Sequence, residues 1–337
     1  MRIFYSEVFK DHKPEGYHPE NPKRLEFAVE GLKEFDLWKN VEEPPEAKVE
    51  ELLRAHSKEY VEKIRELSKT GFSFIDPDTY VSSATWKVAL KAFGAAMEAA
   101  RLALKKKDLY LALVRPPGHH AGKGGRAFNA PTLGFCIFNN SAGATLEIKD
   151  ALGEAVVIDF DVHHGNGTQE IFWEDKDVIH IDIHEEGIYP GSGDVYDIGG
   201  KGAEGSKVNV PMPHYSKDDD YIFVWQEIVL PILKDVKPRV IVVSAGFDAF
   251  KGDGLATMEL SEKFYHFAGA SLSRFSLALI LEGGYSVGLR KGLPAFIEGY
   301  LEGKPELEKI SPKYGTIKVV EEVRKIQSEW WGFSLGL

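Results

Sequence analysis

The stretch AVVIDFDVHHGNGTQE, residues 155–170, begins as an apolar strand and ends in a dense group of polar side chains. Within eight residues it places Asp159, Asp161, His163, His164 and Asn166. Burying charges without partners is costly, so something at the end of this strand must neutralise them. Because side chains alternate along an extended strand, Asp159, Asp161 and His163 would point to one side. The pattern predicts a cluster that can bind a metal ion.

Four further apolar runs end in polar residues or glycine, and they cover residues 108–120, 177–187, 239–249 and 276–285. Near-continuous runs of Val, Ile and Leu are typical of strands that are buried on both faces of a parallel sheet. Helical patterns lie between these runs, over residues 83–107, 221–236 and 258–275. We expect Ser82 or Ser83 to cap the first helix, and Pro231 to kink or break the second.

Strands that alternate with helices predict an α/β fold with a mostly parallel central sheet. Ligands of such sheets bind at the carboxyl ends of the strands, which is where the polar clusters of this sequence fall. We therefore expect one site, assembled from residues between about 115 and 285, within one domain that spans residues 1–337.

Composition narrows the class of protein. The formal net charge of −11 argues against a general nucleic-acid binder, which would have a basic surface. No apolar run reaches the ~18 residues of a membrane-spanning helix, and the N-terminal MRIFYSEVFKDHK lacks the pattern of a signal peptide. The single cysteine, Cys136, excludes a cysteine-rich zinc cluster, and we expect it to be a small buried hydrophobe. These features predict a cytoplasmic protein whose metal ligands are histidine and carboxylate.

Asp161 and His163 have a spacing that suits two ligands of one metal ion, and Asp248, in SAGFDA, is the natural third ligand. Two carboxylates and a neutral imidazole balance a divalent cation. Three protein ligands with an open position are typical of catalytic zinc. A ligand set rich in oxygen would also accept iron or manganese. The alternative, that these are turn residues at strand ends, would have to explain the other polar clusters as well.

A second cluster, RPPGHHAG (115–122), places His119 and His120 in a stiff turn, where they could serve as acid and base groups. Each imidazole needs an orienting partner on its other nitrogen. Asp159 and Asn166 remain for this purpose once the metal has taken its ligands. One histidine would then gain a charged partner, which predicts a higher pKa than that of the other.

Two more motifs predict groups around a substrate. In LEGGYS (281–286), Tyr285 could donate a hydrogen bond to a developing oxyanion, or it could be a core tyrosine after a flexible turn. In TLGFCIFNN (132–140), Phe135 is suited to wall a narrow apolar slot, with Tyr189 opposite and Leu255 as an addition.

Taken in order, the motifs RPPGHHA, GFCIFNN, DFDVHHGNGT, YPGSGD, SAGFDA and EGGY resemble those of the histone deacetylase family. The resemblance is to its zinc-dependent amidohydrolases, which include prokaryotic acetoin-utilisation-type proteins and acetylpolyamine amidohydrolases, and HPENPKRL (18–25) extends it towards the N-terminus. It implies a three-layer arginase/deacetylase-like fold, with a central mostly parallel sheet and helices on both faces. It also implies the hydrolysis of an N-acetyl amide.

The resemblance assigns a role to each matching residue. One Zn²⁺, with Fe²⁺ as an alternative in vivo, would be bound by Asp161, His163 and Asp248. The catalytic residues would be His120 as general base and acid, Asn166 as its partner, His119 as electrostatic partner, Asp159 as its holder, and Tyr285 as oxyanion donor. The substrate slot would be lined by Gly134, Phe135, Tyr189 and Leu255. Arg24 would line an inner channel.

Members of the family also bind monovalent cations, so the resemblance implies structural K⁺ or Na⁺. The first site would be formed by Asp159 and backbone oxygens of Asp161 and His163. A second would use backbone oxygens near Phe172, Asp175 and Val178. This chain has Asp182 where many eukaryotic members carry serine, which adds a charge beside the first site. Either Asp76 or Asp78 would be the acidic residue at the rim of the slot.

The sequence thus predicts a deacetylase of an acetylated lysine or a small acetylated amine, with neither nucleic acid nor membrane as a partner. A homo-oligomer is compatible with it. Glu185 and Glu186, near Tyr189, favour a cationic substrate. One alternative is an arginase-like ureohydrolase, which would need a second metal and carboxylates where this chain has His119 and His120. The other is a non-catalytic binder of acetylated amines, although Tyr285 is present.

Overall fold

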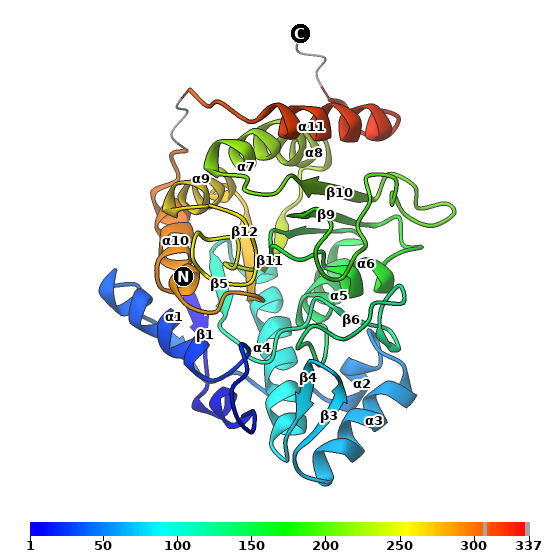
Figure 1. The fold of residues 1–337 in the computed structure, drawn as a ribbon, viewed down its shortest axis with the longest axis vertical. Helices are drawn as coiled ribbons and strands as arrows, with labels where there is room; N and C mark the ends of the chain where they lie inside the picture. The colour runs from blue at the N-terminus through cyan, green and yellow to red at the C-terminus, as the bar shows by residue number, and fades with distance from the viewer. Residues whose placement is uncertain (306–308, 334–337) are drawn as a thin grey trace.

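A parallel sheet of eight strands runs through the middle of the computed structural model, which describes residues 1–305 and 309–333 (Figure 1). In sheet order the strands are β10 (Lys207–Met212), β9 (Val178–Glu185), β8 (Ala155–Asp159), β11 (Val240–Ala245), β12 (Ser276–Leu281), β5 (Leu109–Ala112), β1 (Arg2–Phe4) and β2 (Val41–Glu42). Each strand pairs in parallel with its neighbours. The five strands expected from the apolar runs are all present, and β1, β2 and β10 were not anticipated.

Helices cover both faces of the sheet and complete the three-layer α/β architecture (Figure 1). On one face, α4 (Thr85–Lys105) packs against α5 (Asn140–Leu152) and against the central strands. The opposite layer contains α1 (Lys23–Glu34), α9 (Glu262–Leu272) and α10 (Leu293–Glu302). The remaining helices are α2 (Val49–Leu52), α3 (Lys58–Lys69), α6 (Asn166–Ile171), α7 (Asp218–Val224), α8 (Leu230–Val236) and α11 (Tyr314–Gln327). Two short hairpins are formed by β3 (Ser73–Asp76) with β4 (Thr79–Val81), and β6 (Ala121–Gly122) with β7 (Gly125–Arg126).

The expected cap of α4 is wrong. The helix begins after Ala84, and neither Ser82 nor Ser83 caps it with its side chain. Instead the Thr85 hydroxyl accepts a hydrogen bond from the Ser82 amide at 2.8 Å. The side chain inside the first turn thus bonds back to the preceding loop, reversing the direction of the expected cap.

Pro231 was expected to kink or break its helix, and the break is wrong, because the helical run continues across this residue. A π-helical turn, Trp225–Val229, joins α7 to α8, and Pro231 lies in the first turn of α8. The wider turn accommodates a residue without an amide donor, so the chain keeps its helical path.

The strands end earlier than their apolar runs, and this decides where the site forms. β8 ends at Asp159, so Asp161 and His163 lie on the turn beyond it and not on an extended strand. β5 ends at Ala112, well before His119 and His120. The polar residues therefore lie on loops above the carboxyl edge of the sheet, the usual position of ligand sites in this class.

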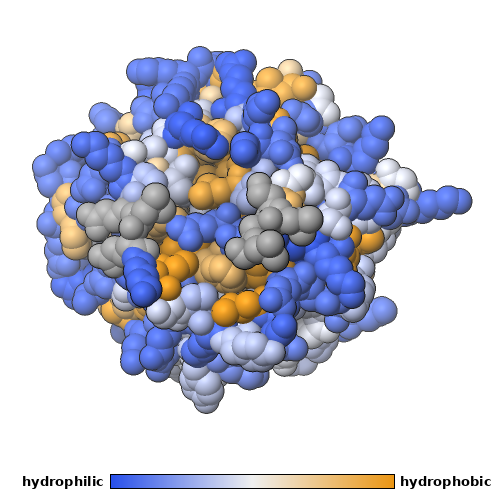
Figure 2. All heavy atoms as spheres, turned by 90° about the horizontal axis from the view of Figure 1, so that it is seen from above, coloured by the Kyte–Doolittle hydropathy of each residue, from blue (hydrophilic) through white to orange (hydrophobic). Residues whose placement is uncertain are grey.

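Polar side chains dominate much of the face seen from above in Figure 2, with apolar patches nearer its middle. None of the helices in the described part of the chain is long and apolar enough to cross a membrane.

Close packing of α9 on α10 gives a test of the fold. A Cβ atom on Gly269 would lie 1.9 Å from the carbonyl oxygen of Phe296. We expect Gly269→Ala to lower the free energy of unfolding by about 1–3 kcal/mol, as overpacking does, even though alanine favours helix over glycine by about 1 kcal/mol. Urea denaturation measures the change.

The matched control is Gly124→Ala, since no atom lies within 4 Å of the added Cβ. It should stay within about 0.5 kcal/mol of the wild type. Equal destabilisation by the two substitutions would contradict the close approach of α9 to α10.

Candidate active site

Three predicted metal ligands meet above the carboxyl ends of β8 and β11. Asp161 and His163 follow β8, and Asp248 follows β11. The Nδ1 atom of His163 lies 3.1 Å from Asp161 Oδ1 and 3.2 Å from Asp248 Oδ2. The candidate ligand atoms of these three residues all lie within 4.8 Å of one another. Asp248, which lies 85 positions beyond His163 in the sequence, thus joins Asp161 and His163 in one compact donor set.

The donor set fits a divalent metal ion. Asp248 Oδ2 is buried and makes no hydrogen bond within the described residues, although His163 Nδ1 lies 3.2 Å away, so the charge of this carboxylate is incompletely compensated. Burial disfavours protonation of His163, but the Asp161 and Asp248 carboxylates outweigh it and raise the pKa of His163 to about 10. Two carboxylates around one imidazole therefore attract positive charge. Oxygen and imidazole ligands suit zinc, iron or manganese.

Glycines make room for this cluster. A Cβ atom on Gly283 would lie 2.2 Å from Asp248 Oδ2 and 2.4 Å from Asp161 Oδ2. A Cβ atom on Gly246 would lie 2.1 Å from Asp161 Oδ2. The Gly283 amide also donates to Asp161 Oδ2 at 2.7 Å. The backbone of the loop after β12 thus lies directly against the carboxylates of Asp161 and Asp248, with no room for a side chain at Gly283.

The adjacent histidines have one charged and one neutral partner, as the sequence predicts, in the pairing that the family resemblance implies. His119 Nδ1 lies 3.1 Å from Asp159 Oδ2, and His120 Nδ1 lies 2.7 Å from Asn166 Oδ1. The two imidazole rings are 4.0 Å apart, centroid to centroid. His120 also approaches the metal ligand His163, at a ring distance of 6.0 Å.

These partners separate the pKa values of the two histidines. Burial opposes protonation of His119, but the Asp161 and Asp159 carboxylates overcome it and raise its pKa well above the usual range. Burial lowers the pKa of His120 far below the usual range, and the neighbouring His119 and His163 lower it further. His120 is therefore a neutral imidazole next to a positively charged one, in agreement with the predicted contrast.

The predicted slot residues Gly134, Phe135 and Tyr189 lie around His120. Tyr189 packs edge-on against the His120 ring at 4.9 Å, and its hydroxyl donates to the Thr132 carbonyl at 3.0 Å. A Cβ atom on Gly134 would lie 2.5 Å from the His120 ring and 2.7 Å from the Tyr189 ring, so only glycine fits there. Phe135 packs edge-on against Tyr285 at 6.2 Å.

The side-chain hydroxyl of Tyr285 makes no hydrogen bond to another of the described residues. Burial raises the pKa of Tyr285 well above its usual range, so the hydroxyl keeps its proton. The ring lies 4.8 Å from the guanidinium carbon of Arg24, and Arg24 Nε donates to the Gly284 carbonyl at 2.6 Å. Arg24 thus holds the loop that carries Tyr285, in addition to the channel position that the resemblance implies.

Arg24 belongs to a buried ion network whose other members sequence reasoning missed. Arg115 binds both carboxylate oxygens of Glu20, at 2.5 and 2.6 Å, and Arg24 binds the same carboxylate at 3.1 Å. Burial opposes ionisation of Glu20, yet the two arginines hold its pKa well below the usual range. Both Glu20 and Arg115 lie within the motifs that carry the family resemblance. Their place in these motifs was the signal that could have identified them as site residues.

Glu282 was missed as well. Its buried carboxylate accepts hydrogen bonds from the amides of Gly118 and His119, at 2.7 and 3.1 Å, and from the Ser141 hydroxyl at 2.9 Å. It therefore holds the turn that carries the histidine pair. An acidic residue directly after an apolar run was the signal that could have revealed it.

Leu255 lies on a separate loop from the other slot residues, with 39% of its surface exposed. That loop is anchored on both sides of Leu255. Asp253 accepts hydrogen bonds from the Tyr285 and Ser286 amides at 2.6 and 2.9 Å, and Thr257 N donates to Glu185 at 3.0 Å. The anchors place the loop beside the Tyr285 turn.

The proposed part of Glu185 in attracting a cation is wrong. Its carboxylate is buried and already bonded, with His214 Nδ1 at 2.6 Å from Oε1 and the Thr257 amide donating to Oε2. Glu186 is exposed. Glu185 ends β9 as a structural anchor for the neighbouring loops, so its charge is not available to a substrate.

Asp76 and Asp78 both bind the loop that precedes Gly134. Asp76 Oδ2 accepts from the Leu133 amide at 2.8 Å, and Asp78 Oδ2 accepts from the Thr132 hydroxyl at 2.6 Å. Burial and the nearby Asp78 raise the pKa of Asp76. The two carboxylates fix the rim of the slot, and neither is singled out as the rim residue.

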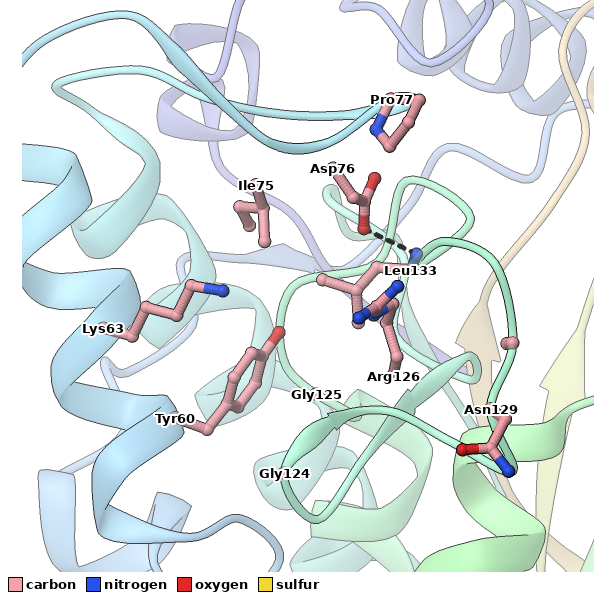
Figure 3. Close-up of a pocket in the computed structure, with 11 residues that line it drawn as sticks. Tyr60, Lys63, Ile75, Asp76, Pro77, Gly124, Gly125, Arg126, Asn129 and Leu133 are labelled. Carbon is pink, nitrogen blue, oxygen red and sulfur yellow. Dashed lines mark hydrogen bonds between the residues drawn. The ribbon is translucent and has the colours of Figure 1, made fainter.

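A pocket of ≈670 Å³ adjoins this rim. Figure 3 shows Tyr60 and Lys63 on one side of it, Arg126 across from them, and Asp76 bonded to Leu133 at its edge. None of the predicted metal or catalytic residues lines it. The pocket is therefore next to the site and separate from it.

The two expected monovalent-cation sites differ in how well they fit. Asp159 lies near His180 and Asp182 in a buried group whose ligand atoms are within 4.8 Å of one another, so the first position offers anionic oxygens. At the second position, the side chain of Lys207 donates hydrogen bonds to the carbonyl oxygens of Asp175 and Val178. The oxygens that were expected to hold a free cation are thus bound to a lysine, and the second expectation does not fit.

Comparisons with known proteins agree with this geometry. A histone deacetylase domain model matches residues 18–299. The chain is 50% identical over 335 residues to an uncharacterised protein of Methanocaldococcus jannaschii, MJ0535, with 98% of this chain and 97% of that protein covered. It is 32% identical to a probable deacetylase of Archaeoglobus fulgidus, with 98% of each chain covered.

It is also 35% identical to histone deacetylase 15 of Arabidopsis thaliana, covering 93% of this chain and 59% of that protein. The crystal structure of the HDA15 HD domain superposes with a TM-score of 0.89 at 32% identity, covering 98% of this chain and 97% of that one. The fold is thus that of the arginase/deacetylase class of α/β hydrolytic enzymes. The chain belongs to the histone deacetylase family.

The buried ion network gives a test that is independent of catalysis. We expect Glu20→Gln to lower the free energy of unfolding by about 3–5 kcal/mol, because Arg115 and Arg24 would remain buried without their carboxylate. Guanidinium denaturation of both proteins measures it. Glu15→Gln, at an exposed position, is the control and should leave stability nearly unchanged. A Glu20→Gln protein as stable as the control would show that the network contributes little.

Proposed function

We propose that this chain is a zinc-dependent amidohydrolase that removes the acetyl group from an acetylated lysine or an acetylated alkylamine. The observation that carries the proposal is one geometric fact. Asp248 Oδ2, a buried carboxylate oxygen without a hydrogen bond, lies in a three-residue donor set beside the neutral imidazole of His120. Asp161, His163 and Asp248 would hold one Zn²⁺, which when bound would polarise the acetyl carbonyl and lower the pKa of a water molecule.

His120 is suited to take the proton of the attacking water. Its Nδ1 faces the amide oxygen of Asn166 at 2.7 Å, so this nitrogen carries the hydrogen of the neutral ring. Nε2 is then left as the acceptor. A base whose pKa lies below neutrality is unprotonated and ready for this step.

Tyr285 and His119 supply the other two functions. The Tyr285 hydroxyl keeps its proton and has no other acceptor among the described residues, so it can donate to the oxyanion. His119, paired with Asp159, is the protonated imidazole of the site. His120, once it has gained the water proton, or His119 would then protonate the leaving amine.

The slot favours an unbranched acyl-amine chain. Phe135 and Tyr189 are aromatic walls, and the absence of a side chain at Gly134 lets the His120 and Tyr189 rings pack directly against the backbone. This supports lysine and linear polyamines alike. Discrimination between them is left to groups beyond the slot, and Glu185 is not one of these.

Replacement of Tyr285 tests the oxyanion role. We expect Tyr285→Phe to retain its metal ion and to lose about 10²–10³ in kcat, the usual effect of removing one oxyanion donor. Steady-state acetate release and metal analysis of the same preparation measure both. Tyr196→Phe, at a residue that is 66% exposed, is the control and should turn over like the wild type. Turnover of Tyr285→Phe at the control's rate would remove Tyr285 from the mechanism.

Metal content and acetate release together test the whole proposal. We expect about one zinc ion per chain and acetate released from at least one of acetyl-lysine peptide, acetylspermidine and acetylputrescine. Asp248→Ala should lose both metal and activity, while Asp11→Ala, at an exposed position, should keep both. Bound metal without acetate from any compound would instead favour other amides or a non-catalytic binder. A wild type that binds no metal would refute the proposal.

A further inference from the structure

Lys207 lies at the start of β10, and its side chain is completely buried. The ammonium group donates three hydrogen bonds. Its acceptors are the carbonyl oxygen of Val178 at 2.8 Å, that of Asp175 at 3.1 Å, and the hydroxyl oxygen of Ser206 at 2.8 Å. All three acceptors are uncharged, which is unusual for a buried lysine, because buried charges are normally paired with opposite charges.

The nearest carboxylate is already paired elsewhere. Asp175 forms an ion pair with Lys149 through Oδ2, and its Oδ1 accepts from the Asp177 amide at 3.2 Å. Among the described residues, no carboxylate lies within ion-pair distance of Lys207. The Lys207 ammonium group is thus bonded only to carbonyl and hydroxyl oxygens, and the Asp175 carboxylate acts on its charge from beyond ion-pair distance.

A shell of neutral backbone oxygens is the environment that proteins provide for monovalent cations. Two of its members here, the carbonyls of Asp175 and Val178, belong to the position where the family resemblance implied a second K⁺ or Na⁺ site. The third predicted carbonyl, that of Phe172, accepts the Asp175 amide at 3.0 Å. An ammonium ion has three N–H donors and here meets three acceptors, so its bonding capacity is saturated.

We propose that the ammonium group of Lys207 permanently fills this cation position, so that the chain needs no free monovalent cation there. The lysine is a tethered replacement for the ion. It joins the loop between α6 and β9, which contains Asp175, to β10 at the sheet edge.

Thermal unfolding under exchange of the monovalent cation tests the proposal. The proteins are wild type, Lys207→Ala and Lys149→Ala, each melted in tetramethylammonium chloride and in KCl at equal ionic strength. Burial lowers the pKa of Lys207 to about 7, so the melts are made near pH 6, where the amine is protonated. Lys149→Ala is the matched control, since it removes a lysine that binds the Asp175 side chain and not the carbonyl shell.

In tetramethylammonium chloride we expect Lys207→Ala to melt several degrees below the wild type. KCl should recover a large part of this loss, because K⁺ can enter the vacated shell, and it should raise the melting temperature of the wild type and of Lys149→Ala by much less. If K⁺ also binds at the first cation position, beside Asp159, it should raise the melting temperature of all three proteins equally. The comparison between the proteins therefore removes this contribution. An equal K⁺ response in all three, or a Lys207→Ala protein as stable as the wild type, would overturn the proposal.

Crystals provide a readout that depends on neither stability nor activity, and Lys207→Ala can be purified in KCl if it does not fold without K⁺. Both proteins are soaked in thallium(I), which mimics K⁺ and scatters anomalously. We expect an anomalous peak beside the Asp175 and Val178 carbonyls in Lys207→Ala and none there in the wild type. A peak there in the wild type, or none in the variant, would refute the tethered-cation assignment.

Discussion

The structure depends on the compensation of carboxylates that are buried above the carboxyl edge of one parallel sheet. These are Asp159, Asp161, Asp182, Asp248 and Glu282, and each is at most 2% exposed. Burying this many carboxylates would cost too much free energy for the protein to fold unless each of them had a hydrogen-bond donor or a cation beside it. Much of the surrounding sequence can be understood as the set of groups that meet this requirement.

Compensation takes two forms, with one exception. Backbone amides donate to Glu282 and Asp161, which requires glycine-rich turns where a side chain would collide with the carboxylates. Imidazoles bind Asp159 and Asp182, with His184 Nδ1 2.6 Å from Asp182. Asp248 is the exception, because its Oδ2 forms no hydrogen bond within the described residues, with His163 Nδ1 3.2 Å away. The incomplete compensation at this residue is what makes the cluster a candidate metal centre and not merely a buried polar network.

The residues at the centre of the site could be predicted from the sequence, but the strands and ion pairs around them could not. Apolar runs located five strands, and the motifs at their ends, through the family resemblance, assigned the His119–Asp159 and His120–Asn166 pairs. The strands β1 and β2 span only three and two residues, too short for a pattern to emerge. The Arg115–Glu20 pair joins residues 95 positions apart, so only the fold reveals it.

The direction in which a side chain points was the other property that the sequence pattern could not predict. Glu185 looked like a charge beside the slot, but it faces His214 and Thr257, because successive residues at a strand end point to opposite sides. The roles of the metal and catalytic residues, and the extent of the single domain, stay predictions from sequence.

Two buried positions attract positive charge, the donor set of Asp161, His163 and Asp248 and the oxygen shell around Lys207. Their different tasks explain why the first would bind an exchangeable ion and the second is filled by a side chain. A metal ion that takes part in hydrolysis must keep a coordination position for substrate, so its ligands cannot satisfy it fully and none of them can be a cation themselves. A cation that only joins a loop to a sheet edge gains nothing from exchange. A lysine whose three N–H groups are all bonded performs that function, and its attachment to the chain removes the dependence on ion concentration that a free ion would bring. The same fold can therefore keep one position open for chemistry and close the other with its own side chain.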